Sequence, residues 1–237
     1  MKFEGHRDYN RLKVAFDLLR NCDGKRILDI GCGKDALLEQ QFGDLEVIGS
    51  DISTSALNNA KKKTPGSEFI LADIRSLPIK DGSIDNVAMI AVLGGLPDGE
   101  EIAAFMEAKR VLRNEGYLII LVSQKCQPYS LLAPDRLFVS RKWRHFNIQL
   151  LQSQLEENGF HINKIIFAGG MMSLIESMAT YFLNIFWQLI YRATNRWEYS
   201  PSVPRYWINK IMSLDYRPNN GKRKYLSRFI YIVAQKI

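Results

Sequence analysis

The sequence predicts an α/β fold in which a mostly parallel sheet is covered by helices on both faces. Three apolar segments near residues 26–30, 46–50 and 68–72 each carry or lead into an acidic residue, and the first also ends in a glycine turn. Stretches with helical spacing of apolar residues lie between them. Such alternation is typical of parallel sheets with right-handed crossovers, which bind ligands at the carboxyl ends of their strands.

The elements follow one another at regular spacing up to residue 122. Helices are expected near 7–20, 35–42, 54–63 and 98–112. Strands are expected near 26–30, 46–50, 68–72, 86–92 and 116–122. Ser53 is a suitable N-cap for the third helix, and the acidic residues of Asp98-Gly99-Glu100-Glu101 suit the first turn of the fourth.

The C-terminal part completes the sheet after a long insertion. Asn147 is expected to cap a helix, Asn158-Gly159 to end it, and strands are expected at 162–168 and 228–236. Residues 169–226 exceed an ordinary loop, so we predict a helical insertion within a single domain spanning 1–237.

The insertion contains an apolar run, Met171 to Thr194, that is long enough to be tested as a membrane span. Polar residues recur in it every three or four positions, and a span would separate the last strand from its sheet. We therefore expect a helix that packs on the domain, covers a substrate pocket or lies in a membrane interface.

The glycine turn is the first chemical signal. In Asp29-Ile30-Gly31-Cys32-Gly33 the glycines allow the backbone to approach a ligand closely. Gly31 and Gly33 together with Ala36 also satisfy the relaxed dinucleotide pattern, so the turn alone allows a nicotinamide enzyme. Asp51 lies 18 residues after Gly33 and is placed to accept hydrogen bonds from ribose hydroxyls of either cofactor class.

The third strand end distinguishes between these classes. Ala72-Asp73-Ile74 leads into Arg75-Ser76-Leu77-Pro78-Ile79-Lys80-Asp81-Gly82-Ser83-Ile84-Asp85. With the glycine turn, this run resembles the motifs of class I S-adenosylmethionine-dependent methyltransferases, in particular the type 11 small-molecule and lipid-like family. The resemblance covers roughly 22–168 and the last strand. It implies a Rossmann-like sheet of seven strands with the last strand antiparallel, and S-adenosyl-L-methionine as cofactor.

The resemblance also implies roles for individual residues. The loop at Asp29 would hold the methionine end of the cofactor, Asp73 would accept from the adenine amino group, and Ile74 would lie along the ring. The full expected cofactor-binding set is Asp29, Gly31, Cys32, Gly33, Asp51, Ile52, Asp73, Ile74 and Ala91.

The catalytic group is less well defined by the sequence. Many family members carry a histidine after strand four in a His-His-Leu-Pro-Asp motif, whereas this chain reads Leu93-Gly94-Gly95-Leu96-Pro97-Asp98. The candidates for a general base are therefore His145, in a basic and aromatic loop, and His6, near the N-terminus. The Asp/Asn-Pro-Pro-Tyr/Phe motif of amino-directed nucleic-acid enzymes is missing, so nucleic acid is not the expected acceptor.

Composition and charge indicate where the protein acts. Three cysteines without metal-ligand spacing indicate a reducing compartment and no metal site, and the charged N-terminus does not resemble a signal peptide. Residues 171–237 hold ten Lys and Arg against three acids, which accounts for the whole net charge of +7. We expect a cytoplasmic protein, with peripheral attachment to an anionic membrane as a second expectation.

The expected function is methyl transfer from S-adenosyl-L-methionine to oxygen or carbon of a small, apolar or amphipathic acceptor. A catalytically silent S-adenosylmethionine-binding partner subunit is the alternative, because the strand-four histidine is missing.

Overall fold

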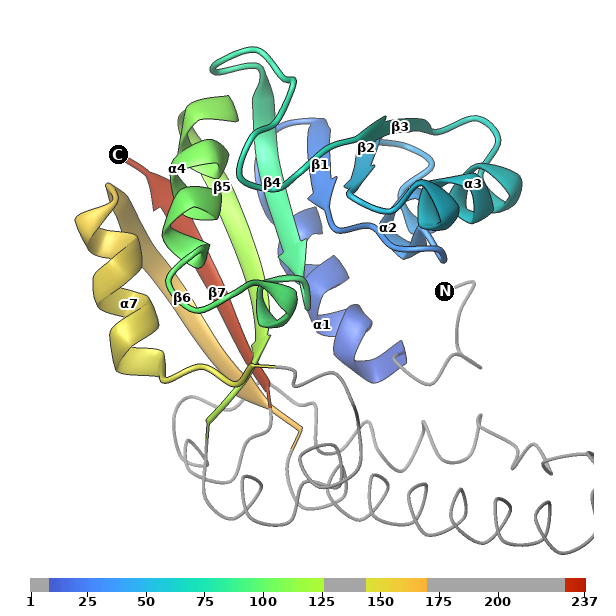
Figure 1. Cartoon of the computed structure of the whole chain (residues 1–237). Coiled ribbons are helices and arrows are strands. Elements are labelled where there is room, and N and C mark those ends of the chain that lie inside the picture. Colours follow the sequence, from blue (N-terminus) through green and yellow to red (C-terminus); the bar gives the residue numbers. More distant parts are fainter. Residues whose placement is uncertain (1–8, 126–143, 170–228) are drawn as a thin grey trace, which may run out of the picture.

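The computed structural model describes residues 9–125, 144–169 and 229–237. Seven strands form one sheet in the order β3-β2-β1-β4-β5-β7-β6 (Figure 1). The strands are β1 (Arg26–Ile30), β2 (Glu46–Asp51), β3 (Glu68–Leu71), β4 (Ile84–Ile90), β5 (Leu112–Ser123), β6 (Phe160–Ala168) and β7 (Phe229–Lys236). Only β7 runs antiparallel to its neighbours, β5 and β6, so the expected fold class is confirmed.

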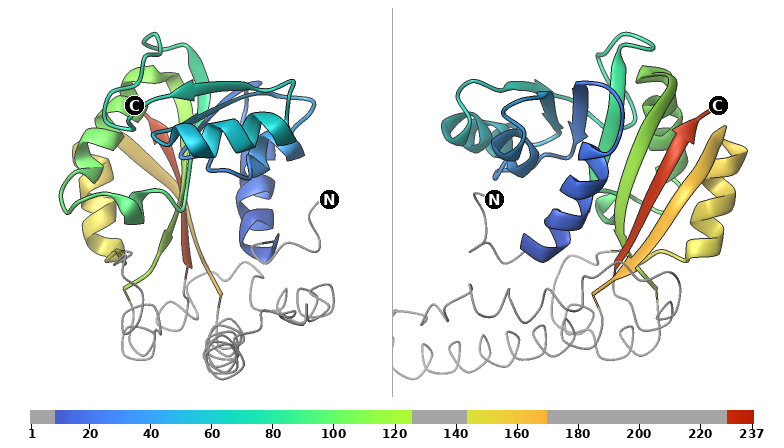
Figure 2. Two further views of the ribbon diagram at one scale, coloured as in Figure 1. Left: turned by 45° about the vertical axis from the view of Figure 1, so that its right-hand side comes forward. Right: turned by 180° about the vertical axis from the view of Figure 1, so that it is seen from behind.

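Helices cover both faces of this sheet. Helices α4 (Glu101–Val111) and α7 (Ile148–Glu157) lie on one face, and α1 (Tyr9–Arg20) lies on the other (Figures 1 and 2). The shorter α2 (Leu37–Gln41) packs beside β2, and α3 (Thr54–Lys63) packs beside β2 and β3. The short 3-10 turn η1 (Leu93–Gly95) follows β4.

The core is divided by the sheet into two apolar layers. Along β7, Ile230, Ile232 and Ala234 face the layer under α4 and α7, whereas Tyr231 and Val233 face the layer under α1. Such continuous apolar runs are expected for strands that are buried on both faces. These two layers fix the sheet, and they leave its edge at the carboxyl ends of β1 to β4 free for a binding site.

The helix caps follow the sequence. The Ser53 hydroxyl accepts from the backbone N–H of Ala56 at 3.2 Å, and the Asn147 side chain accepts from the N–H of Gln149 at 2.9 Å. Both residues thus satisfy backbone donors that a helix start leaves unpaired.

Most strand boundaries agree with the prediction to within two residues, and two differences, at the end of β4 and at the start of β5, have a visible cause. β4 ends at Ile90, because Ala91 adopts a left-handed conformation with φ 55°. β5 begins at Leu112, directly after α4, and Glu115 with φ 61° occupies a place in this segment where the family usually has glycine.

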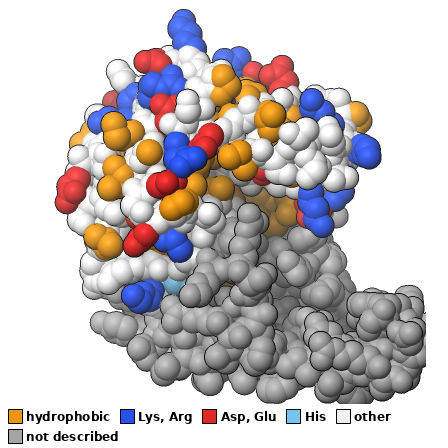
Figure 3. All heavy atoms as spheres, in the orientation of Figure 1, with side chains coloured by type: hydrophobic (Ala, Val, Ile, Leu, Met, Phe, Trp, Pro, Cys, Tyr) orange, Lys and Arg blue, Asp and Glu red, His pale blue; other side chains and the backbone are white. Residues whose placement is uncertain are grey.

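The predicted apolar helix 171–194 and the rest of the insertion lie outside the described residues. Among the helices that the structure describes, none is long and apolar enough to cross a lipid bilayer. On the face shown in Figure 3, charged side chains of both signs are interspersed with apolar ones.

Candidate functional site

A cavity of about 420 Å³ opens where β1, β2, β3 and β4 end. Parallel strands of this topology gather their carboxyl ends at one edge, which is where ligands bind in open α/β sheets. The cavity is lined by Ile30, Gly31, Ser50, Asp51, Ile52, Ala72, Asp73, Ile74, Arg75, Ala91, Val92, Gly95, Leu96, Pro97 and Glu100.

The glycine turn contributes Gly31 to the wall of this cavity. Gly31 has φ 76°, and its N–H donates to the Ser50 carbonyl at 2.7 Å. A Cβ atom on Gly31 would lie 2.7 Å from Cβ of Val92, whereas a Cβ atom on Gly33 (φ 65°) would meet nothing within 4 Å. Gly31 is therefore required by packing, and Gly33 leaves open space for a ligand.

Asp51 joins the turn to the start of α3. Its Oδ2 accepts from the N–H of Gly33 at 3.0 Å, and its Oδ1 accepts from the N–H of Ser53 at 2.9 Å. These bonds orient the carboxylate at the cavity wall while each oxygen retains a lone pair for a hydroxyl donor.

Two further acids lie behind the turn. Asp29 is 4% exposed and Glu39 of α2 is 6% exposed, and neither Glu39 oxygen has a hydrogen-bond partner among the described residues. Burial raises the pKa of Asp29, and the charges of Glu39 and Asp51 raise it further. Burial also raises the pKa of Glu39, to about 7. The two carboxyl groups therefore do not both ionise readily near neutral pH.

The strand pairing explains how Glu39 fits there. Gly49 of β2 is the register partner of Asp29 on β1, and a Cβ atom on Gly49 would overlap Oε1 of Glu39. The missing side chain of Gly49 thus makes room for the Glu39 carboxyl group beside Asp29.

Cys32 is a neutral residue in this turn. Burial raises the pKa of its thiol, and the charges of Asp29, Glu39 and Asp51 raise it further. The thiol is thus a poor nucleophile, because the thiolate is the reactive form.

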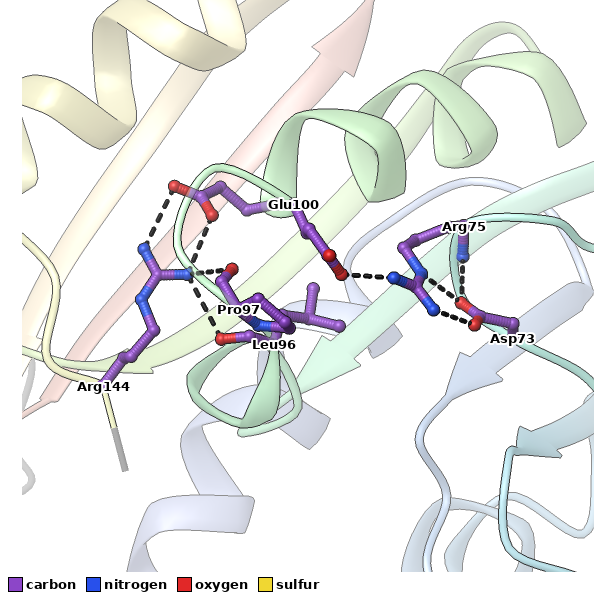
Figure 4. A network of polar contacts seen from close by, with 7 residues as sticks. Asp73, Arg75, Leu96, Pro97, Glu100 and Arg144 are labelled. Atoms are coloured by element: carbon purple, nitrogen blue, oxygen red, sulfur yellow. Dashed lines mark hydrogen bonds and ion pairs between the residues drawn. The ribbon is translucent and has the colours of Figure 1, made fainter. Parts of the chain in front are cut away.

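Asp73, Arg75 and Glu100 form an ionic chain along the opposite wall of the cavity (Figure 4). Asp73 Oδ1 accepts from the backbone N–H and from Nε of Arg75, both at 2.9 Å. Asp73 Oδ2 accepts from Nη2 of Arg75, and Nη1 donates to Glu100 Oε2. The hydrogen bonds from Arg75 lower the pKa of Asp73, so this carboxylate stays ionised.

A second arginine holds the other side of the same loop. Nη1 of Arg144 donates to the Pro97 carbonyl at 2.8 Å (Figure 4). It also donates to Glu101 Oε2 at 2.9 Å, and Nη2 pairs with Asp98. The backbone N–H of Arg144 also donates to Gly94 of η1 at 3.0 Å. The segment that carries Leu96 and Pro97 into the cavity is thus fixed from both sides.

The apolar wall suits a flat aromatic ring. Ile52 is a large apolar residue that remains 71% exposed at the cavity, and Leu96 and Pro97 line the cavity as well. An exposed isoleucine next to a cavity is informative, because apolar side chains of this size are usually covered.

The predicted cofactor residues fall into two groups. Gly31, Asp51, Ile52, Asp73, Ile74 and Ala91 line the cavity. Asp29, Cys32 and Gly33 belong to the turn beside it. Their contacts with a ligand stay predictions.

The two predicted bases also remain predictions. His145 is half-buried next to Arg144 and does not line the cavity, and His6 lies outside the described residues.

Sequence reasoning missed Glu39, Arg75 and Glu100. A glycine inside the second strand is a signal of close approach by another group, and it could have indicated Glu39. The Asx turn at Asp73-Ile74-Arg75-Ser76 can be recognised in the sequence. Glu100, the second partner of Arg75, lies 25 positions after Arg75 and is brought close only by the fold.

Comparison with known proteins identifies relatives of the central part of the chain. Residues 28–120 match the family model Methyltransf_11, described as a methyltransferase domain. The chain is similar to a demethylmenaquinone methyltransferase from Thermotoga maritima, at 30% identity over 112 residues that cover 46% of this chain and 48% of the relative. The chain spans about a third to a half of the length of the first curated relatives it matches.

Solved structures extend the likeness to the whole fold. A SAM-dependent methyltransferase from Archaeoglobus fulgidus has a TM-score of 0.65 at 19% identity, with 99% of this chain and 96% of the other covered. The [4+2]-cyclase SpnF has a TM-score of 0.63 at 19% identity, with 96% and 80% covered. At these identities the likeness establishes the fold.

Residues 28–120 thus match a methyltransferase domain, and the sheet has the fold of S-adenosylmethionine-dependent methyltransferases, as the motifs predict. S-adenosyl-L-methionine is the cofactor of that class, and the cavity fits it. The cavity region combines an acid at the end of β2, a glycine turn with open space and an exposed apolar side chain, which are groups suited to a nucleoside with a methionine tail.

Proposed function

We propose that this protein transfers a methyl group from S-adenosyl-L-methionine to oxygen or carbon of a small, apolar or amphipathic acceptor. The observation that carries the proposal is the 420 Å³ cavity, in which the glycine turn and the acids Asp51 and Asp73 face one space at the ends of three neighbouring strands. An acid at each of two strand ends supplies acceptors for the hydroxyl and amino donors of a nucleoside.

Each part of the cofactor has residues suited to hold it. Gly31 and Gly33 would hold the methionine tail, Asp51 the ribose, and Asp73 with Ile74 the adenine. When bound, the cofactor supplies a sulfonium-activated methyl group. Among the residues that the structure describes, the lining has three acids, Asp51, Asp73 and Glu100, and one cation, Arg75, which suits a ligand with net positive charge.

The chain contributes to the reaction mainly by positioning. Holding the acceptor atom in line with the methyl group converts an encounter between two molecules into a step within one complex. The loop through Leu96 and Pro97, fixed by Arg144, provides a rigid apolar wall for this purpose.

His145 is the proposed general base. It follows Arg144, which is anchored on η1, and it precedes Phe146, which bridges to Gln124 at the end of β5. Both anchors lie next to the strand ends around the cavity. A neutral imidazole there would take the proton from an acceptor hydroxyl or carbon acid. His6 is the second candidate.

The apolar nature of the acceptor is supported by the sequence of the insertion and by the curated relative named for demethylmenaquinone. Residues 171–194 are rich in Met, Leu, Ile and aromatic residues, and Met-rich surfaces adapt to irregular apolar ligands. The basic residues that follow suit an anionic membrane surface, so we propose a cytoplasmic protein with peripheral membrane attachment.

A second candidate is an S-adenosylmethionine-binding protein without methyl transfer. The missing histidine after β4 favours this candidate. A structural neighbour named as a [4+2]-cyclase has the same fold, and one fold can carry several kinds of chemistry.

Binding and turnover separate the two candidates. We expect S-adenosylhomocysteine to bind in isothermal titration, and Asp51→Ala to weaken it roughly tenfold or more because hydrogen bonds to a charged group are lost. We also expect methyl transfer to at least one member of a panel of quinones, prenyl compounds and phenols. Binding without any transfer across the panel would favour the silent protein. Absence of binding in the folded wild-type protein would refute both candidates.

A further inference from the structure

Arg75 is a residue of the cavity wall to which the resemblance assigns no role. Its backbone N–H and its guanidinium group make three hydrogen bonds to the Asp73 carboxylate, two to Oδ1 and one to Oδ2. Its remaining guanidinium nitrogen reaches Glu100, the residue directly before α4. Asp73, Arg75 and Glu100 all line the cavity.

The local sequence builds this arrangement. Asp73 begins a tight turn in which the N–H of Ser76 donates to its carbonyl at 3.0 Å, while its side chain accepts from the N–H two residues on. The turn therefore holds the Arg75 side chain against the carboxylate that precedes it. Glu100 has no side-chain capping bond to α4, so its carboxylate is available to Arg75.

The pattern of these bonds determines what the carboxylate can still accept. An ionised carboxylate offers about four lone-pair positions. Arg75 takes two on Oδ1 and one on Oδ2, so Oδ2 keeps a position for one further donor. The group can only accept, because it stays ionised while the guanidinium is bound to it.

We propose that Arg75 is a positioning residue that makes Asp73 selective for a purine carrying an exocyclic amino group, which here means adenine over hypoxanthine. This inference rests on the proposed cofactor site. The amino group at position 6 of adenine donates to the free lone pair of Asp73. Hypoxanthine carries an oxo group at that position, which is itself an acceptor and would face a fixed negative charge. A site built to accept a hydrogen bond rejects a ligand without the donor.

Arg75 is expected to act through orientation and through charge. Two parallel N–H···O bonds fix the plane of a carboxylate more firmly than a single contact. Without them only the backbone N–H of residue 75 holds the Asp73 carboxylate, so Oδ2 is no longer fixed in one direction. The lysine variant restores the charge without the fork, so it separates the two effects.

The test compares S-adenosylhomocysteine with S-inosylhomocysteine, its 6-oxo analogue, in isothermal titrations of the full chain. We expect wild type to prefer the adenine ligand and Arg75→Ala to narrow the preference by about tenfold, mainly through weaker binding of the adenine ligand. Arg75→Lys should restore part of the preference. Asp73→Asn should narrow it as well, and the double variant should narrow it little further, since both residues act on one contact.

Two controls keep the result specific. Arg26 and Glu46 form an ion pair about as exposed as that of Arg75 and Asp73, but it lies at the starts of β1 and β2, away from the cavity. Arg26→Ala should therefore leave the affinities for both ligands unchanged. Glu100→Gln breaks the bridge to α4 but leaves the Asp73 pair, so it should preserve most of the preference.

A pH series adds a readout that a purely structural role would not move. In Arg75→Ala the pKa of Asp73 should rise toward its ordinary value. Adenine-ligand affinity should then begin to fall at a higher pH than in wild type as the solution is acidified. An unchanged preference in a folded Arg75→Ala protein would overturn the inference. Failure of wild type to bind either nucleoside would instead refute the proposed function.

Discussion

Ala91 lines the cavity with a backbone conformation that alanine rarely adopts. Its φ of 55° falls in the left-handed region, and Ala36, at the start of α2, has φ 45°. This conformation costs a non-glycine residue roughly 1–2 kcal/mol, and such strain gathers at binding sites. Together with Gly31 and Gly33, these residues shape the backbone around the cavity.

The two glycines of the turn should respond differently to the same substitution. Gly33→Ala places a methyl group in open space, so the protein should stay folded with a small loss of stability from φ strain, while S-adenosylhomocysteine affinity falls. Gly31→Ala drives its methyl group into Val92, so it should lower the unfolding temperature much more. Thermal unfolding and isothermal titration measure the two effects.

The Gly31 effect has its own control. Gly31→Ala combined with Val92→Ala should recover part of the stability, because the overlapping side chain is shortened. Unaltered affinity in folded Gly33→Ala would mean that the ligand stays away from the turn.

At the scale of elements, the start of α4 depends on a buried ion pair. The Glu101 side chain is only 4% exposed, whereas that of Asp98, which contacts the same arginine, is 93% exposed. Burial alone would raise the pKa of Glu101, but the hydrogen bonds and charge of Arg144 outweigh it and the pKa is lowered.

Arg144→Ala should therefore be costly for stability. It leaves the Glu101 carboxylate buried without its cation, which typically costs about 3–5 kcal/mol. Asp98→Ala removes an exposed partner of the same arginine and should change stability little. Urea unfolding at pH 7 gives both values, and equal effects of the two variants would contradict the assignment of Glu101 as the buried partner. Since the pKa of Glu101 is depressed, its stabilising contribution should disappear as the pH falls through that pKa.

The buried Glu39 of α2 should make stability depend on pH in the direction opposite to that of Glu101. The Glu39 carboxyl has an ordinary pKa of 4.5 and a folded pKa of about 7, so the folded state binds more protons between these values. The free energy of unfolding should fall as the pH rises from about 4.5 to 7 and level off above. The full shift corresponds to about 3 kcal/mol.

Glu39→Gln should reduce this pH dependence, because the amide does not ionise, while Asp29, whose pKa is also raised, still contributes a part of it. Urea unfolding at pH 5, 6, 7 and 8 tests it. Asp17→Asn on α1 is a suitable control, since the Asp17 side chain is 55% exposed. A slope that is the same in wild type and in Glu39→Gln would show that another group is responsible.

Most elements were predictable because their pattern of apolar residues is long and regular. In β5, for example, Ile119 and Leu121 face one core layer, and Leu118 and Ile120 face the other. The end of β4 was not predictable, since apolar residues continue past it and only the conformation of Ala91 stops the strand. The strand-end acids could be read from the sequence, but the Arg75 bridge to Glu100 depends on the fold bringing the start of α4 close to the segment that follows β3.

At the scale of the whole molecule, charge is divided along the chain. Residues 1–170 contain 22 basic and 22 acidic residues, and residues 171–237 contain the entire excess of +7. The cofactor domain is therefore electrically balanced. The basic part coincides with the insertion that carries the apolar run 171–194. A basic and apolar combination is what binds an anionic membrane interface.

We expect the protein to float with anionic vesicles at low salt, to bind neutral vesicles less, and to detach as salt is raised. Each basic residue near an anionic surface contributes about 1 kcal/mol, and the attraction decays within a Debye length. Changing Lys222, Arg223 and Lys224 to Gln should therefore weaken vesicle binding by roughly a hundredfold.

Lys61, Lys62 and Lys63 at the end of α3 provide the charge-matched control, and changing them to Gln should leave vesicle binding unchanged, because they belong to the electrically balanced part of the chain. Equal loss in both triple variants would mean that net charge alone attracts the protein. Failure to float at low salt would refute membrane attachment, and the apolar run would then be a cover over a soluble acceptor or part of the packing. Changing Phe186 and Trp187 to Ser separates these, since lost turnover with intact S-adenosylhomocysteine binding indicates a cover, and general unfolding indicates packing.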